Sequence, residues 1–227
     1  MLGLTYLDLF AFGWFLIAWG IHAATVERSE WRKRSLNYRM DLARREWMLK
    51  MLDRDVRIVD TQIMSALQQG TAFFASSSLF AIGGALALLR SSDEVMDIFR
   101  ALPFAVQATR GVFEIKVVGL LVIFVYAFFK FAWSYRLFNY AVILLGGTPP
   151  SKEAKTKAAK IYAERLARMT TIAGRHFNRG QRAIFFALAY LGWFVNGYVL
   201  AIASAAVLVV ILTRQFGPTA HWLFEQK

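Results

Sequence analysis

Residues 112–131 read VFEIKVVGLLVIFVYAFFKF, an apolar run whose charges lie only near its two ends. A helix needs about 20 such residues to cross the hydrocarbon of a bilayer. Similar stretches run from about Leu4 to Ala24, from Ala66 to Leu89 and from Ala183 to Thr213. The sequence therefore predicts an all-α fold, an integral membrane protein with four transmembrane helices.

The composition agrees with this fold class. Of the 227 residues 57% are hydrophobic, and the chain contains 20 Phe. A soluble protein of this size cannot bury so much apolar surface, whereas a membrane protein can expose it to lipid. The chain has no Cys, which excludes disulfides, thiolate catalysis and Cys-type metal sites. His22, His176 and His221 are scattered in the sequence, so we expect neither a metal nor a cofactor.

The ends of the apolar segments indicate how each continues. Residues 1–8 contain no Lys or Arg, although a signal peptide carries a positive region there, so we expect the first segment to be a retained span. The third segment continues to Leu145, and we predict one long helix that leaves the membrane and stops at Gly146-Gly147. The fourth, residues 183–213, is long enough that it must tilt or project into water.

Basic residues gather in two of the loops. Ten Lys and Arg accompany seven acids between Thr25 and Ser65, and nine accompany two acids between Gly146 and Arg182. The intervening loop, residues 90–111, has three of each sign. In a chain with four spans the two basic loops share a side. The positive-inside rule makes that side cytoplasmic and predicts that both termini are extracytoplasmic.

Both basic loops are predicted to contain amphipathic helices, over about residues 28–63 and 149–178. In the first loop, the pairs Glu46/Lys50 and Asp53/Arg57 have the i,i+4 order that supports a helix. One apolar stripe is formed there by Met48, Leu52, Val56, Val59 and Ile63.

The second loop helix is predicted to begin at Thr148-Pro149-Pro150, as an N-cap followed by proline in the first turn. Its apolar stripe is Ala158, Ile161, Tyr162, Leu166, Met169, Ile172 and Ala173. The sequence does not distinguish between basic loop helices that lie on the membrane and helices that pack as a cytoplasmic bundle.

Small residues recur at four-residue spacing in two of the spans. They are Ser77, Ala81 and Ala85 in the second span and Gly197, Ala201 and Ala205 in the fourth. Such spacing lets helix backbones approach closely within a membrane. It predicts tight helix packing, either within one subunit or between subunits.

Several motifs together resemble the family known as domain of unknown function 599. They are RREWMLKM at 44–51, RIVD at 57–60, FFASSSLFAIGG at 73–84, FKFAWSYRLFNY at 129–140 and GGTPP at 146–150. The resemblance covers nearly the whole chain, as one domain over residues 1–227. It implies a multi-pass membrane protein of bacteria and plants, with no established activity or functional residues. We therefore expect a bacterial inner (plasma) membrane location.

Ionisable groups near membrane depth are costly and are the first candidates for function. Asp8 and His22 flank the first span, about 21 Å apart at helical rise. The simpler interpretation makes Asp8 an interfacial carboxylate and gives His22 a hydrogen bond to backbone or headgroup. The functional alternative for His22 is titration near neutral pH.

The third span carries charges at both ends. Glu114 and Lys116 are two residues apart and point to different helix faces. Lys116 and Lys130 are about 21 Å apart, so they are either two snorkelling anchors or basic groups at the mouths of an anion pathway. Because four helices leave little room beyond their own packing, a pathway would need several subunits.

Three further polar residues complete the candidate set. Asn196 lies well inside the fourth segment, where an interhelical hydrogen bond is the usual role of an amide. Arg136 and Asn139 are expected to tie the projecting end of the third helix to the loop helices.

The sequence has no P-loop, G-x-G-x-x-G, H-E-x-x-H or G-x-S-x-G motif, so we do not expect an enzyme. Two hypotheses stay nearly level. One is a homo-oligomer that forms or supports a small-ion pathway. The other is a non-transporting scaffold whose basic loop helices bind a partner or anionic lipid. A lipid-modifying enzyme is a weaker third. The expected partners are lipid headgroups and further copies of the chain, without nucleic acid.

Overall fold

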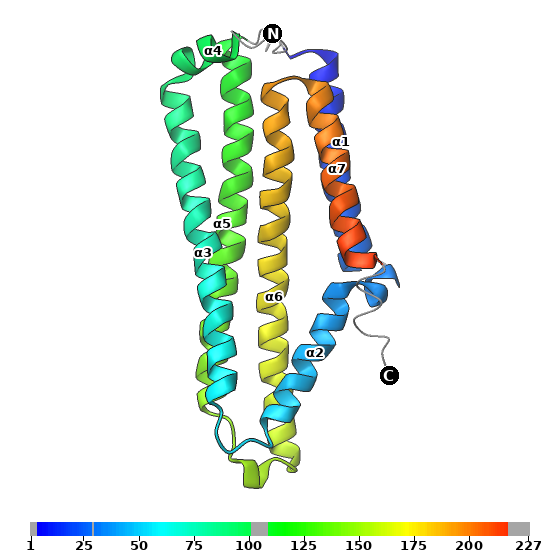
Figure 1. Cartoon of the computed structure of the whole chain (residues 1–227), viewed down its shortest axis with the longest axis vertical. Coiled ribbons are helices and arrows are strands. Elements are labelled where there is room, and N and C mark those ends of the chain that lie inside the picture. The colour runs from blue at the N-terminus through cyan, green and yellow to red at the C-terminus, as the bar shows by residue number, and fades with distance from the viewer. Residues whose placement is uncertain (1–3, 29, 101–108, 218–227) are drawn as a thin grey trace. The chain divides into compact units, whose positions relative to one another are not determined.

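The computed structural model describes residues 4–28, 30–100 and 109–217 (Figure 1). Expectations for residues 1–3, for the loop over 101–108 and for His221 fall outside these ranges. The described elements are helical: α1 Tyr6–Ala23, α2 Leu36–Met51, α3 Ile58–Arg90, α4 Ser92–Arg100, α5 Arg110–Gly146, α6 Lys157–Leu191 and α7 Gly197–Phe216. A π-helical stretch covers Ala24–Arg28, and 3-10 turns cover Glu30–Arg34, Ser151–Glu153 and Gly192–Phe194.

Four helices are long and apolar enough to cross a membrane, which confirms the predicted fold class to that extent. They cover Tyr6–Val26, Ile58–Arg90, Arg110–Gly146 and Gly197–Phe216. The helix predicted to pass from the third span through to Leu145 is a single helix, α5, which ends at Gly146.

The chain forms two compact units. Unit 1 comprises Met1–Asn37, Ser78–Tyr126 and Arg182–Lys227, and unit 2 comprises Tyr38–Ser77 and Ala127–Gln181. Helices α3, α5 and α6 each contribute residues to both units.

In unit 1, α1 is antiparallel to the last part of α6. Phe12 stacks on Trp193 with ring centroids 5.1 Å apart, and Trp19 stacks on Phe186 at 5.1 Å. As residue numbers rise along α1, those of the partners on α6 fall. Buried aromatic side chains thus hold the first and sixth helices together.

Helix α7 runs parallel to α1 (Figure 1). A Cβ on Gly197 would lie 2.9 Å from Leu7 Cγ, and the Trp14 indole donates to the Ala201 carbonyl at 3.2 Å. The predicted close packing at Gly197 and Ala201 therefore occurs within one chain.

The prediction of one unbroken fourth span over residues 183–213 is wrong. Helix α6 ends at Leu191, and α7 begins at Gly197 after a tight turn. Gly192 permits the turn, since a Cβ there would lie 2.8 Å from Val199 Cγ1. Asn196 starts α7 as its N-cap, with Oδ1 accepting from the Val199 amide at 2.9 Å. The segment is a helical hairpin.

This hairpin also bears on where the chain ends lie. Because α1 and α7 run in the same direction, the beginning of α1 and the end of α7 are at opposite ends of unit 1. The expectation that both termini share a side rested on a single fourth span, and the arrangement of unit 1 does not support it.

Unit 2 is a small helical bundle of α2 with parts of α3, α5 and α6. Its core consists mostly of Met, Leu and Ala side chains: Met48, Met51, Leu52, Met64, Leu137, Phe138, Ala141, Leu145, Ala154, Ala159, Ala163, Leu166, Ala167 and Ala173. The small alanines of α6 let its neighbours approach closely.

The helix predicted over residues 28–63 is broken after Met51. The chain turns over residues 52–57, so Val56 is 69% exposed and the predicted stripe does not form one face. The Asp53/Arg57 helix pair is lost with it. Arg57 instead donates to the carbonyls of Thr148 and Pro149 at 3.1 and 2.6 Å.

The predicted Glu46/Lys50 pair is present at 2.7 Å within α2. Helix α6 begins at Lys157, later than predicted, because Thr156 is the capping residue and its Oγ1 accepts from the Ala159 amide at 3.2 Å. The buried face of α6 includes Leu166 and Ala173 as predicted. It omits Ile161 and Ile172, which are 45% and 44% exposed and project from the surface of unit 2.

Candidate functional site

Unit 1 contains a cluster formed by Asp8, Lys116 and Trp193, in which Lys116 and Trp193 are buried. Lys116 Nζ lies 3.5 Å from Asp8 Oδ1 and donates to the Trp193 carbonyl at 2.8 Å. The Trp193 indole donates to the same carboxylate oxygen at 2.6 Å. Lys116 is only 6% exposed within the single chain.

Local structure fixes each member of this cluster. Asp8 belongs to a capping box with Thr5, and its Oδ2 accepts from the Thr5 amide at 3.1 Å and the Thr5 hydroxyl at 2.7 Å. Trp193 lies in the turn between α6 and α7, and its ring lies 5.1 Å from Lys116 Nζ. The cluster is electrically neutral and ties α1, α5 and the turn together.

A second polar contact in unit 1 joins His22 to Arg182. Both residues are buried, and Arg182 Nη1 lies 3.1 Å from His22 Nδ1. A guanidinium can only donate, so Nδ1 must be the acceptor and a neutral imidazole carries its proton on Nε2. The sequence had placed His22 near a headgroup, and its contact is a buried side chain on α6.

Apolar side chains fill the interior of unit 1 between these two polar contacts. Phe15 is 2% exposed and packs edge-on against Phe186 and Tyr190, with ring centroids at 5.7 and 5.4 Å. Tyr190 in turn presses against Gly119 of α5, where a Cβ would lie 2.1 Å from its hydroxyl. Close aromatic packing therefore separates Asp8 and Lys116 from His22 and Arg182.

The remaining predicted residues are not brought to a common site. Glu114 accepts from Arg110 at 2.8 Å, and Asn196 caps α7. The other three belong to unit 2. Arg136 donates to the Tyr140 hydroxyl at 2.6 Å, Gln68 donates to Asn139, and Lys130 is partly buried on α5.

Sequence reasoning did not find a buried carboxylate in unit 2, Asp60. It is fully buried in the first turn of α3 and accepts from the Trp47 indole at 2.7 Å and from Arg54. The contacts span the break between α2 and α3, which explains how the chain turns there. Among the described residues no three His, Cys, Asp or Glu side chains lie close enough to hold a metal ion.

Unit 2 carries an open hollow along α6, called here the basic groove. Its volume is about 660 Å³. The lining residues are Lys155, Lys157, Lys160, Ile161, Glu164, Arg165 and Arg168. Five of these seven side chains are cationic and one is acidic.

The acidic residue of the basic groove is already engaged. Arg45 of α2 lies 2.5 Å from Glu164, and this hydrogen bond holds the pKa of the Glu164 carboxyl below its usual value. The same contact raises the pKa of Arg45. Since Arg45 compensates Glu164, the groove presents an excess of positive charge to a ligand.

The family model for the protein of unknown function DUF599 matches residues 10–220, which is most of the chain. The chain belongs to the DUF599 family. No curated protein and no solved structure matches this DUF599 protein. The family assignment confirms the resemblance seen in the sequence motifs and carries no activity with it.

Proposed function

We propose that this DUF599 protein is a membrane-embedded scaffold that presents the basic groove of unit 2 to an anionic partner in the cytoplasm. The observation that carries the proposal is the imbalance of charge in the groove, where five cations accompany one carboxylate that Arg45 already compensates. The buried charges Asp8 and Lys116 of unit 1, by contrast, neutralise each other within the chain.

The scaffold is proposed to cross the membrane five times rather than four, on the basis of the helix directions in unit 1. Parallel α1 and α7, with α6 antiparallel to both, support a crossing by the last part of α6 as well. The apolar part of α6 from Ala183 to Leu191 is too short to be recognised as a span. Arg182 precedes it, and its contact with His22 would reduce the cost of placing a guanidinium near the hydrocarbon.

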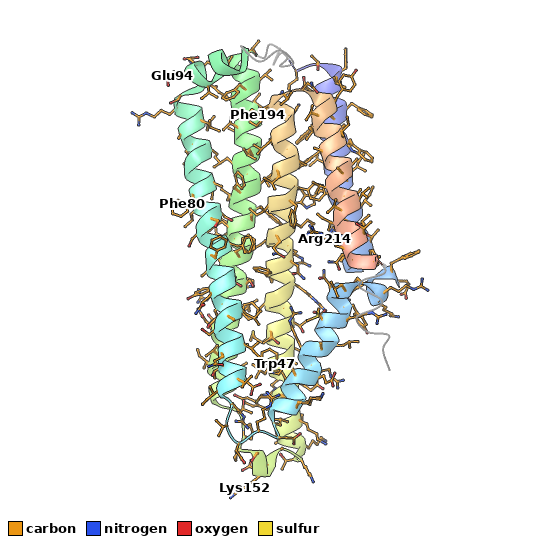
Figure 2. The ribbon with its side chains drawn as sticks, viewed as in Figure 1. Trp47, Phe80, Glu94, Lys152, Phe194 and Arg214 are labelled. Atoms are coloured by element: carbon orange, nitrogen blue, oxygen red, sulfur yellow. The ribbon has the colours of Figure 1, made fainter. Side chains whose placement is uncertain are left out.

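The positive-inside rule then assigns the cytoplasmic side. Within unit 1, Arg32, Lys33 and Arg34 follow the end of α1, and Arg214 lies near the end of the parallel helix α7 (Figure 2). The start of α1 and the turn over Gly192–Phe194 face the opposite side. Outward apolar side chains such as Phe80 on α3, 81% exposed, suit contact with lipid (Figure 2).

Anionic lipid is proposed to contact the 3-10 turn Glu30–Arg34 and not the basic groove. Trp31 is 61% exposed with Arg34 at 5.6 Å from its ring, a combination suited to the headgroup region. On α6, by contrast, about 22 Å of helix separates Arg168 from Ala183 at 1.5 Å per residue. That exceeds the Debye length of about 8 Å at physiological salt, so the groove is assigned to a soluble partner.

The packing of unit 1 weighs against an ion pathway through the interior of a single chain. Lys116 is engaged by Asp8 and Trp193, and apolar rings such as Phe15 separate that cluster from His22. Any pathway would therefore have to lie between subunits. Vesicles containing the purified protein are expected to leak small ions no faster than protein-free vesicles.

Topology is tested with single cysteines, because the native chain has none. Tyr6→Cys, at a side chain 94% exposed where α1 begins, and Arg214→Cys, at an exposed position, are expressed separately in whole cells. An impermeant maleimide is expected to label the first variant directly and the second only after permeabilisation. Labelling of both in intact cells would restore four crossings and remove the five-span topology.

Partner binding is tested on protein in neutral nanodiscs with fluorescent polyglutamate and polyphosphate as probes. The double variant Lys157→Gln/Lys160→Gln is expected to weaken binding. The control Lys50→Gln/Lys152→Gln removes the same charge from unit 2 outside the groove (Lys152 is labelled in Figure 2) and is expected to have little effect. Equal loss in both variants, or no binding of either probe, would reject the scaffold function.

A further inference from the structure

The basic groove has an apolar centre. Ile161 lies among its cationic residues and is 45% exposed, and the neighbouring Ala158 is also exposed. On a surface that faces water, an exposed Ile among Lys and Arg is not explained by solubility. Burial by a ligand would remove its apolar area from water, which is favourable.

We infer that the basic groove binds an acidic amphipathic helix of another protein. The inference rests on the proposed function and names the partner of the same site. Two features of the ligand follow from the groove: carboxylates to meet the Lys and Arg side chains, and an apolar face to cover Ile161.

The spacing of the groove residues fits a helical ligand. Lys157, Ile161, Glu164 and Arg168 recur at intervals of four, three and four, which places them on one face of α6. From Lys157 to Arg168 this face is about 16 Å long, or three helical turns. A second helix can lie along it at an interaxial distance of about 8–10 Å.

The charge pattern along the face also favours a protein over a phosphate polymer. Cations occupy both ends of the groove, at Lys155 to Lys160 and at Arg165 and Arg168, whereas Ile161 and Glu164 lie between them. A polyphosphate or nucleic-acid backbone carries charge at every unit and would set a phosphate against the apolar Ile161 side chain. A helix can place acids at its two ends and apolar residues at its centre, which matches the groove. A uniformly charged polymer cannot match it in this way.

A second copy of the chain does not meet this requirement at the groove. The same face of another copy carries the same excess of Lys and Arg, so two such faces would repel. The occupant is therefore a chain with acidic residues, recruited to the surface of unit 2.

Fluorescence anisotropy with the full-length protein in neutral nanodiscs tests the inference. The first probe is a synthetic helical peptide with glutamates at both ends and leucines along one face. The second is polyglutamate of equal charge, and the third is polyphosphate. The amphipathic peptide is expected to bind most tightly, and Lys157→Gln/Lys160→Gln is expected to weaken it about tenfold through the loss of two ion pairs.

Ile161→Ser separates this inference from the broader proposal, because it removes the apolar contact and leaves every charge in place. It is expected to weaken the amphipathic peptide severalfold and to leave polyglutamate unchanged. Val56→Ser, at another exposed apolar side chain of unit 2, is the control and is expected to leave the affinity for both probes unchanged.

Three results would overturn the inference while leaving an anionic partner in place: equal affinity for the peptide and polyglutamate, tighter binding of polyphosphate, or no effect of Ile161→Ser. If no probe responds to Lys157→Gln/Lys160→Gln, both the inference and the proposed function fail.

Discussion

Replacing Lys116 with Met should destabilise unit 1, and the structure indicates by how much. Lys116 is 6% exposed and its ammonium lies 3.5 Å from Asp8. Removing one member of a buried ion pair typically costs about 3–5 kcal/mol. In Lys116→Met the carboxylate keeps its hydrogen bonds from Thr5 and Trp193, so we expect the lower value, about 3 kcal/mol.

The converse change, Asp8→Asn, leaves the ammonium with the carbonyl and the ring of Trp193 alone. We expect a greater loss, about 4–5 kcal/mol. The double variant Asp8→Asn/Lys116→Met leaves no buried charge and should be more stable than the milder single variant, Lys116→Met, by about 2 kcal/mol. Glu114→Gln is the control, because its pair with Arg110 is exposed to solvent and its loss should change stability little.

The assay is equilibrium unfolding of the detergent-solubilised protein by a denaturing detergent, followed by circular dichroism and Trp fluorescence. The double-mutant cycle gives the coupling between Asp8 and Lys116 directly. If the losses of the two single variants simply add in the double variant, the pair is not coupled and the buried cluster is not what holds α1 to α5.

Gly119→Ala should lower the thermal unfolding midpoint, because the new Cβ would lie 2.1 Å from the hydroxyl of Tyr190. The control is Gly111→Ala, where a Cβ meets nothing within 4 Å, and this change should be neutral or slightly stabilising. Unchanged midpoints in both variants would contradict the packing of α5 against α6. Glu164 has a folded-state pKa below its unfolded value through Arg45, so its contribution to stability is complete above the unfolded pKa and is lost as the pH falls through the folded pKa. Glu164→Gln should remove this acid-side loss from pH-dependent unfolding curves, and an identical pH profile would refute the role of the pair.

The features that the sequence predicted correctly are local ones. Hydropathy and length identified four apolar helices, and the glycines at 146–147 identified the end of α5, because a helix and its stop depend on neighbouring residues. The family motifs were also recognisable, because each is a short run of consecutive residues.

The turn between α6 and α7 was missed because its residues are themselves apolar. Trp193 and Phe194 are as hydrophobic as the helices on either side, so hydropathy continues across the turn (Phe194 is labelled in Figure 2). A signal was present. Asn196 followed by Gly197 is a turn signal, Asn is a favoured N-cap residue, and the segment is about ten residues longer than a bilayer requires.

The partners of the buried charges were beyond the reach of sequence reasoning for a different reason. Asp8 and Lys116 each look like an interfacial residue when considered alone, and so does His22. Their pairing depends on which helices are neighbours and in which direction each runs. The direction of α7 was itself mistaken, so the contact between His22 and Arg182 could not be anticipated.

The contacts of α1 also determine when unit 1 can form during synthesis. The partner of His22 is made 160 residues later, and the indole that binds Asp8 is made 185 residues later. At about 5–20 residues per second, translation needs roughly 10–40 seconds to supply them. During that interval α1 is present in the cell with a carboxylate and an imidazole that lack their final contacts. Helix α1 therefore cannot reach its final environment until α6 and the turn after it have been made.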